Sequence, residues 1–453
     1  MEVLTHPVKG RCLLTTRLIL AGEVVLDEPP LLTIVAPDHA GSTCAACMRV
    51  VPPEQALPCS SCAAAVFCSP SCAAAGTQFA WLHGPAMCGV YATIAASGAC
   101  LEDQLAARFL AHAWCLRQMG AAGQDPDQRY AKLHTLCSEP RQEDMAMAVR
   151  LAQMLAGALG LTEADLPELA TLLRKDALNS YGVIAHTPLG APRALRGSAL
   201  YQQCALLNHE CNPNCARFDT FDGRSTNMVF RAMHDLPPGT EVTQSYVPLN
   251  WSFEERQVQT REVYGFACNC ARCQAECSGL MDLLGMDSDL DMSEDDEPPA
   301  ASPSAAAGAA AGAGAAGPSG GDGGDGGAGG AGTGAAAAGA AGADLYTLPP
   351  NADEGPLEPT YLHLFLLKYV CPVPGCFGTL APTNPEVWPD EGAYVYVCNV
   401  CGASRTGAQF LESLDADDAH AHDHHAHDLT HGHDHDHGHD HGHTHDHGHA
   451  HAH

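Results

Sequence analysis

The segment from residue 44 to residue 88 holds the side chains with the most specific chemistry in the sequence. Seven cysteines and one histidine lie there at short intervals: Cys44, Cys47, Cys59, Cys62, Cys68, Cys72, His83 and Cys88. A C-x2-C pair places two thiolates on one ion, and Zn²⁺ takes four Cys or His ligands. We therefore predict two zinc sites, which supply folding energy and a binding surface rather than a reaction. The spacing disfavours a cysteine-rich loop without metal and predicts that Cys68 and Cys72 share one face of a helix.

Two further groups of cysteines have the spacing of metal ligands. The first group supplies three ligands, Cys268, Cys270 and Cys273, and needs a fourth from elsewhere. The residues alone leave three candidates for it: Cys277, Cys211 and Cys215. The second group has the paired knuckles of a zinc ribbon, formed by Cys371, Cys376, Cys398 and Cys401.

The stretch LLNHECNPNC, residues 206–215, combines apolar and polar residues unusually closely. Each amide or imidazole that leaves water without a partner costs roughly 1–3 kcal/mol. The stretch is therefore either exposed or surrounds something that satisfies its polar groups.

The length, charge and composition restrict which classes of protein are compatible with the sequence. The chain has 453 residues, enough for two or three domains of about 100–200 residues each. With 22 Lys and Arg against 53 Asp and Glu, the formal charge is −31, which disfavours direct nucleic-acid binding and favours attraction to basic polypeptides. The first residues lack the pattern of a signal peptide, and no stretch predicts a membrane span. Cysteines that hold metal then indicate the nucleus or the cytoplasm.

Local patterns predict an α+β protein followed by low-complexity segments. Val/Leu/Ile-rich runs broken at Gly22 and at Pro29-Pro30 indicate strands, whereas Ala and Leu at helical spacing, as from Ala146 to Leu159, indicate helices. An acidic run and Ala/Gly/Asp repeats are too poor in large apolar groups to fold. The expected boundaries are a β-rich start (1–43), a zinc finger (44–88), a helical insert (89–178), a return to strands (179–267), a second zinc segment (268–285), a disordered linker (286–345), a small zinc-ribbon-like module (346–410) and a disordered His-rich tail (411–453).

The tail contains most of the 26 histidines, alternating with Asp, Gly and Ala from His420 to His453. Near pH 7 most imidazoles are neutral, because their reference pKa is about 6.5, so we expect the tail to bind divalent Zn²⁺, Ni²⁺ or Cu²⁺. A solvated repeat without biological purpose is the alternative.

In this order the segments closely resemble the SET and MYND family of protein lysine methyltransferases, in which a MYND finger interrupts a SET domain. The resemblance covers the chain from residue 1 to Cys277. Four motifs carry it around the finger: the opening KGRCLLTTRLILAGEVV, the signature formed by Asn208, His209, Cys211, Pro213 and Asn214, the GTEVTQSY motif, and the post-SET CNCARC. The resemblance implies a SET-domain β fold with a finger, a helical insert and a post-SET zinc site. It also implies S-adenosylmethionine-dependent lysine N-methylation.

The resemblance further implies how the metal ligands pair. In the finger, one ion is held by Cys44, Cys47, Cys68 and Cys72, and the other by Cys59, Cys62, His83 and Cys88. At the post-SET site, Cys211 is the implied fourth ligand beside Cys268, Cys270 and Cys273.

Roles at the reaction centre also follow from the resemblance. Methyl transfer to an amine needs a neutral nucleophile, alignment and little water. Tyr246 is implied to direct its hydroxyl at the amine or the sulfonium, and Tyr181 and Tyr264 to wall the lysine channel with it. The implied cofactor-binding residues are Lys9, Gly10, Arg11, Asn179, Asn208, His209, Tyr246 and Phe266.

Several of these residues have plainer interpretations. Asn179 ends an Ala/Leu-rich helix, so a helix C-cap is a rival role. The pair Asn208-His209 is compatible with a turn cap. Ordinary core packing is the alternative for Tyr246, Tyr264 and Phe266.

The sequence departs from the family at two places, the first loop and the C-terminal part, and a third position concerns the number of methyl groups added. Cys12 stands where the family's first cofactor loop has a second glycine, which matters if that position needs a positive φ angle. Gln244 stands two residues before Tyr246, where some SET enzymes use Phe or Tyr to set the number of methyl groups added. The linker, the ribbon and the tail replace the family's C-terminal helical repeat domain.

We expect methyl transfer to basic protein segments such as histone tails. A second hypothesis is a catalytically weak scaffold that recruits proline-containing peptides through the MYND finger, and a third is metal buffering through the tail. A measured cofactor affinity discriminates the first two.

Overall fold

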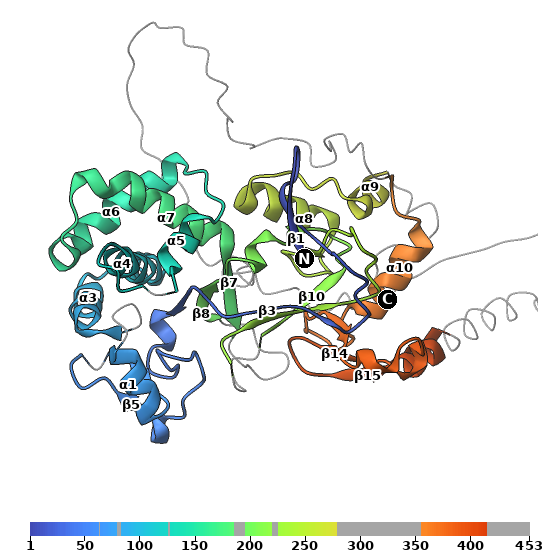
Figure 1. The fold of residues 1–453 in the computed structure, drawn as a ribbon, viewed down its shortest axis with the longest axis horizontal. Coiled ribbons are helices and arrows are strands. Elements are labelled where there is room, and N and C mark those ends of the chain that lie inside the picture. Colours follow the sequence, from blue (N-terminus) through green and yellow to red (C-terminus); the bar gives the residue numbers. More distant parts are fainter. Residues whose placement is uncertain are drawn as a thin grey trace, which may run out of the picture.

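A computed structural model describes residues 1–62, 64–78, 83–125, 127–184, 195–219, 225–278 and 355–414. Figure 1 shows a central β region, with a helical insert on one side and a C-terminal module on the other. The predicted linker and the tail from residue 415 onward lie outside the described residues. Among the residues described, no helix is long and apolar enough to cross a membrane.

The central region contains four small sheets whose strands come from distant parts of the chain. Strands β1 (Glu2–His6) and β2 (Gly10–Leu14) form an antiparallel hairpin. A three-stranded sheet has the order β10-β11-β3, formed by Cys215–Asp219, Met228–Ala232 and Val24–Glu28. Another has the order β4-β8-β7, formed by Leu32–Val35, Leu195–Leu200 and Ser180–Ile184. The short strands β9 (Asn208–His209) and β12 (Thr243–Gln244) pair in parallel.

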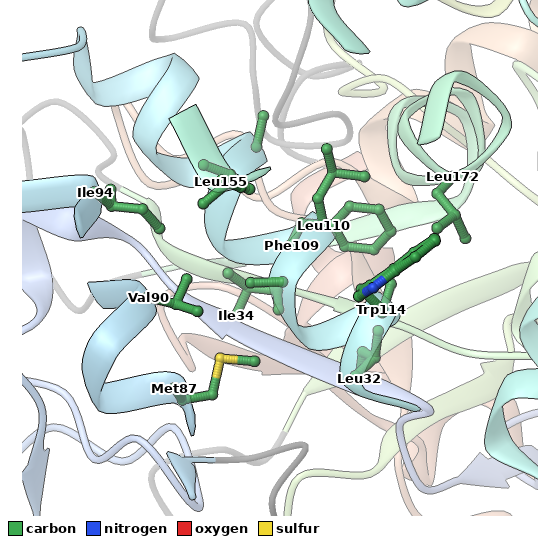
Figure 2. Packing of buried hydrophobic residues seen from close by; sticks show 14 of the residues in the cluster. Leu32, Ile34, Met87, Val90, Ile94, Phe109, Leu110, Trp114, Leu155 and Leu172 are labelled. Atoms are coloured by element: carbon green, nitrogen blue, oxygen red, sulfur yellow. The ribbon is translucent and has the colours of Figure 1, made fainter. Parts of the chain in front are cut away.

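The helical insert packs its apolar faces against one of these sheets. Its main helices are α3 (Pro85–Ala96), α4 (Leu101–Ala121), α5 (Arg129–His134), α6 (Gln142–Leu159) and α7 (Leu166–Asn179). Figure 2 shows Phe109 and Leu110 of α4 in the same cluster as Leu155 of α6 and Ile34 of β4. All four side chains are fully buried. Burying such side chains contributes roughly 1.5–3 kcal/mol each, so the insert and the sheet share one core.

The segment before the insert contains only short elements among its described residues, and several of its side chains belong to the main hydrophobic core. It contains β5 (Leu57–Pro58), β6 (Val66–Phe67) and α1 (Pro70–Gln78). The prediction that Cys68 and Cys72 share one helix face was wrong, because Cys68 precedes α1. Ser69 ends the preceding turn, and its Oγ accepts a hydrogen bond from the Cys72 main-chain N–H at 3.1 Å. A serine in this capping position, followed by Pro70, starts the helix after Cys68.

The part of the described chain that precedes the C-terminal module ends in two short helices. These are α8 (Phe253–Gln259), which continues into the π-helical turn η5 (Thr260–Tyr264), and α9 (Ala271–Cys277). Ser252 and Glu255 form a capping box at the start of α8.

The C-terminal module begins with α10 (Pro359–Tyr369) and continues with a small antiparallel sheet. Its strands are β13 (Leu380–Pro382), β14 (Val395–Cys398) and β15 (Ser404–Thr406). A last helix spans residues 407–414, so the predicted boundary after residue 410 falls within it.

Gly197 marks the closest approach between β8 and β4 and gives a test of this packing. A Cβ atom there would collide with the Ile34 carbonyl oxygen. We predict that Gly197→Ala lowers the free energy of unfolding by about 1–3 kcal/mol, because the added methyl overpacks the sheet. The control is Gly157→Ala in α6, where nothing lies within 4 Å of the added Cβ. That change should stabilise the helix by up to about 1 kcal/mol. Equal unfolding midpoints for the two variants in urea would contradict the packing described.

Candidate active site

The parallel pair of β9 and β12 brings two distant segments together. Asn208 aligns with Thr243 and His209 with Gln244, and Tyr246 follows two residues later. Asn214 fixes the same pairing from the side: its Oδ1 accepts from the Thr243 N–H at 2.9 Å and its Nδ2 donates to the Glu241 carbonyl at 2.7 Å. These bonds satisfy polar groups of the LLNHECNPNC stretch within the fold.

Asn208 joins this pair to the first loop of the chain. Its Nδ2 donates to the Arg11 carbonyl oxygen at 3.2 Å and to Glu241 Oε1 at 2.9 Å. Lys9 Nζ pairs with Glu241 Oε2 at 3.2 Å. Burial opposes ionisation of Glu241, but hydrogen bonds from Asn208 and the Lys9 charge hold its pKa below its ordinary value. The loop that contains Lys9, Gly10 and Arg11 therefore lies beside Asn208.

Cys12 has the extended backbone conformation of a strand residue. Cys12 lies within β2, and within the described chain the positive-φ residues other than glycine are Met48 and Gln128. Gly10 supplies the left-handed conformation of this turn, with φ of 75°. The Cys12 thiol accepts from Asn208 Nδ2 at 3.3 Å, and burial followed by its contact with Glu241 raises its pKa to about 11. Cys12 is thus a neutral thiol, and its position requires no glycine.

The His209 side chain links two parts of the site. The Tyr246 main-chain N–H donates to His209 Nδ1 at 3.0 Å, so this nitrogen is an acceptor and the proton of the neutral ring is on Nε2. His209 Nε2 lies 3.2 Å from Cys211 Sγ and donates to it. One imidazole therefore connects the main chain at Tyr246, just after β12, to the cysteine cluster that contains Cys211.

Three aromatic rings extend from His209. The His209 ring centroid is 5.2 Å from that of Tyr246 and 5.9 Å from that of Phe266, and Tyr246 lies 4.8 Å from Tyr264. Phe266 is 37% exposed, so part of an aromatic side chain next to His209 is open to solvent. The Tyr246 hydroxyl donates to the Leu207 carbonyl oxygen at 3.0 Å. Burial raises the pKa of both Tyr246 and Tyr264 above the ordinary value of 10, so both hydroxyls are neutral near pH 7.

Tyr181 lies deeper and is held by Gln244. The Tyr181 hydroxyl donates to the Cys204 carbonyl oxygen at 2.8 Å and accepts from Gln244 Nε2 at 2.6 Å. Gln244 Nε2 also lies 3.4 Å from the Leu207 carbonyl oxygen, the acceptor of the Tyr246 hydroxyl. The two ends of the turn formed by η4 (Cys204–Leu206) and Leu207 thus supply the main-chain carbonyls that accept from the two tyrosines.

Asn179 is the last residue of α7, and its amide is used within the protein. Its Nδ2 donates to the Lys175 carbonyl oxygen at 2.7 Å and to the Cys137 carbonyl oxygen at 2.9 Å. The Lys175 ammonium bonds to the carbonyl oxygens of His134 and Leu136. Asn179 therefore helps to hold the segment 134–138, and Ser180 is the helix C-cap.

The structure brings the sixteen predicted metal ligands into four groups, and within each group the ligand atoms lie within 4.8 Å of one another. Neighbouring Sγ atoms are 3.6–3.8 Å apart. A tetrahedral zinc site with Zn–S bonds of about 2.3 Å has edges of about 3.8 Å, so the sulfur positions fit this ion. The groups are Cys44, Cys47, Cys68 and Cys72; Cys59, Cys62, His83 and Cys88; Cys211, Cys268, Cys270 and Cys273; and Cys371, Cys376, Cys398 and Cys401.

The arrangement at the third group is the one that the resemblance implies. Cys211 Sγ lies 3.8 Å from Cys268 Sγ and 3.6 Å from Cys273 Sγ. Hydrogen bonds from the neighbouring thiols lower the pKa of Cys211 well below its ordinary value. Cys277 packs beside this cluster without belonging to the group of four, and Cys215 lies in the core of the β region.

Two buried arginines around this group were not predicted. Arg256 Nε donates to Cys211 Sγ at 3.3 Å, and its guanidinium pairs with Glu276. Arg272 donates to the Cys211 carbonyl oxygen at 3.2 Å and also pairs with Glu276. Four thiolates on Zn²⁺ carry a net charge of −2, which the two arginines, paired with the one carboxylate of Glu276, offset in part. Nothing in the spacing of FEERQVQ distinguishes Arg256 from a surface residue, so no sequence signal identified it.

Comparison with known proteins identifies the family. The SET domain model matches residues 10–247, more than half of the chain. Histone-lysine N-methyltransferase ASHR2 of Arabidopsis thaliana is 30% identical over 425 residues, which are 87% of this chain and 92% of the relative. The chain belongs to the SET and MYND domain-containing family of protein-lysine methyltransferases. It is therefore a SET-type protein-lysine methyltransferase, as predicted.

Relatives with SMYD names match a smaller part of the chain. Histone-lysine N-methyltransferase SMYD3 of Homo sapiens is 26% identical over 285 residues, 61% of this chain and 59% of the relative. N-lysine methyltransferase SMYD2-B of Danio rerio is 26% identical over 293 residues, 63% of this chain and 62% of the relative. The chain thus spans about three fifths of the length of these two SET-domain relatives.

Cys211→Ser tests the third ligand group. We predict that it lowers the zinc content by one ion per chain, because three remaining thiolates bind Zn²⁺ much more weakly than four ligands. Metal analysis gives the number of ions. Alkylation followed by mass spectrometry locates the loss, since Cys268, Cys270 and Cys273 should become reactive.

The control for this test is Cys277→Ser, which changes a cysteine beside the same cluster and should leave the zinc content unchanged. Full zinc content in Cys211→Ser together with a loss in Cys277→Ser would move the fourth ligand to Cys277.

Proposed function

We propose that this SET enzyme methylates lysines in basic protein segments such as histone tails. The observation that carries the proposal is the meeting of Asn208, His209 and Tyr246 at the β9–β12 pair, with the half-exposed ring of Phe266 at its border. The formal charge of −31 supports a basic partner. The relatives ASHR2 and SMYD3 are both named histone-lysine N-methyltransferases, which agrees with this choice.

The cofactor proposed for this site is S-adenosylmethionine, which supplies an electrophilic methyl group when bound. The residues present fit it: amide and main-chain groups at Asn208 and His209, the Lys9–Arg11 loop, and the exposed face of Phe266 for an adenine ring. Asn179 also belongs to the proposed cofactor site, and its contribution there is to hold the segment 134–138. Tyr246 completes the proposed set of cofactor-binding residues.

The tyrosines are proposed to align the amine. Because the Tyr246 hydroxyl donates to the Leu207 carbonyl, its oxygen lone pairs face other directions and can accept a hydrogen bond from a lysine amine. Tyr264 and Tyr181 wall the channel with it. A neutral phenol is a poor base, so the lysine ammonium loses its proton to water before the transfer, and the tyrosines orient the resulting lone pair.

The zinc groups are proposed to be structural. In this assignment residues 44–88 form a MYND finger with two ions, the group that contains Cys211 is the post-SET site, and the module around Cys371 is ribbon-like. The domain boundaries given in the sequence analysis are proposed together with these zinc sites.

Proline-containing peptides are the proposed ligands of the finger. The proposed location of the protein is the nucleus or the cytoplasm.

Tyr246→Phe tests the assignment of the reaction centre. We predict that it lowers methyl transfer by about 10- to 100-fold, because the amine loses an orienting group while the ring packing remains. The assay uses S-adenosylmethionine with a labelled methyl group and a panel of core histones. Tyr130→Phe is the control, since that hydroxyl bonds Glu168 in the helical insert. Equal rates for both variants in an active preparation would refute the role of Tyr246.

The raised pKa of Tyr246 and Tyr264 gives a prediction for pH dependence. Both phenols stay protonated to above pH 10, whereas a lysine ammonium, with a reference pKa of about 10.4, deprotonates progressively as the pH rises. The single-turnover rate should therefore increase up to about pH 9.5. Tyr246→Phe should show the same slope at a lower rate. The account would be contradicted if the rate of the unmodified protein fell with rising pH below pH 9.5 and the rate of Tyr246→Phe did not. The fall must be reversible, with activity restored when the protein is returned to pH 8.

A further inference from the structure

The C-terminal module, residues 355–414, shares a hydrophobic core with the catalytic region. Phe365, Tyr369 and Leu380 of the module pack in one buried cluster with Ala216 and Met233 of the β10–β11 region. Figure 1 shows the module, in orange and red, against this part of the molecule. Gly22 allows a close approach, because a Cβ atom there would lie 3.1 Å from the Pro382 carbonyl oxygen. The module is thus docked on the catalytic sheet.

Three side-chain hydrogen bonds fix the docked position. Trp388 Nε1 donates to Asp235 Oδ2 at 2.9 Å, and the Tyr369 hydroxyl donates to the Met233 carbonyl oxygen at 2.9 Å. Asn399 Nδ2 donates to the Arg217 carbonyl oxygen at 2.8 Å. Asn399 is itself held in the module, because its Oδ1 accepts from the Thr379 N–H at 2.8 Å. The third bond differs from the other two because its acceptor belongs to Arg217, whose side chain contacts Tyr181.

Arg217 connects that bond to the tyrosines of the site. It belongs to β10, an edge strand of its sheet. Its Nη2 donates to the Gly182 carbonyl oxygen at 2.8 Å, next to Tyr181. Its guanidinium carbon lies 5.5 Å from the centre of the Tyr181 ring, and Asp219 pairs with it at 3.4 Å. A shift of the Arg217 backbone therefore moves the guanidinium that lies near the Tyr181 ring and donates to the Gly182 carbonyl oxygen.

We propose that Asn399 and Arg217 are positioning residues through which the C-terminal module sets Tyr181 in the wall of the lysine channel. This inference rests on the proposed function of Tyr181. It gives the module a part in the reaction, although none of its described residues belongs to the groups assigned to cofactor or lysine. The route is a chain of direct contacts: Thr379 holds Asn399, Asn399 holds the Arg217 backbone, and the Arg217 side chain holds Gly182 and Tyr181.

Asn399→Asp is the most selective variant for a test. An aspartate keeps the oxygen that accepts from the Thr379 N–H but replaces the donor to Arg217 with a second oxygen, which repels the carbonyl. Asn384 offers a matched control inside the module, since its Nδ2 donates to the Ala393 carbonyl oxygen and its Oδ1 accepts from the Val395 N–H. Asn384→Asp makes the same chemical change without touching Arg217. Trp388→Phe removes a docking bond elsewhere.

The steady-state kinetics with a histone peptide give the first result. Asn399→Asp should lower kcat about tenfold at unchanged zinc content and unchanged affinity for S-adenosylmethionine, because only the alignment of the lysine changes. The two controls should stay within about twofold of the unmodified protein. In the background of Arg217→Met the Asn399→Asp change should have little further effect, since the route is already cut.

Hydrogen exchange gives a result that does not depend on activity. Asn399→Asp should raise exchange at least threefold in the peptide that contains residues 180–184, and the controls should not. Kinetics and exchange equal to those of the controls would overturn the inference. If the unmodified protein transfers no methyl group to any histone, the proposed substrate class fails, and exchange at 180–184 still decides whether Asn399 positions β7.

Discussion

The site depends on one structural constraint, the parallel pairing of β9 with β12. Two strands of two residues each cannot hold distant segments together by their ladder alone, so side chains complete the pairing. Asn214 bonds Thr243 and Glu241 at the beginning of β12, Asn208 reaches back to the first loop, and His209 accepts from the main-chain N–H of Tyr246. Three polar residues of LLNHECNPNC, Asn208, His209 and Asn214, are therefore groups that close the site.

The Cys211 group extends this constraint to the end of the catalytic region. Cys211 receives His209 Nε2 from one side and Arg256 Nε from the other. The three cysteines that gather around it follow Phe266 in sequence, so the same cluster places that ring near His209. A metal held there would fix the relative positions of a strand, an imidazole and an aromatic ring without taking part in the reaction. Methyl transfer needs such alignment more than it needs an acid or a base.

The sequence predicted the local features well and the long-range ones only through resemblance. Ligand spacing indicated the Cys and His groups because a metal knuckle is a local structure, and periodicity indicated α6. The helix beginning was misplaced at Cys68 because the cap at Ser69 was not weighed. Arg256 and Asn399 have no sequence signal, since their roles arise from partners 45 and 182 residues away. For the same reason the docking of the C-terminal module was not foreseen.

The central claim is that the β9–β12 pair and its neighbours form one centre for cofactor and lysine. A crystal structure of the protein with S-adenosylhomocysteine tests it most directly. The account predicts that the adenine lies against the exposed face of Phe266, that the amino-acid end lies at Asn208, and that the sulfur faces the Tyr246 hydroxyl. A ligand bound elsewhere, or a sulfur directed away from Tyr246, would contradict it.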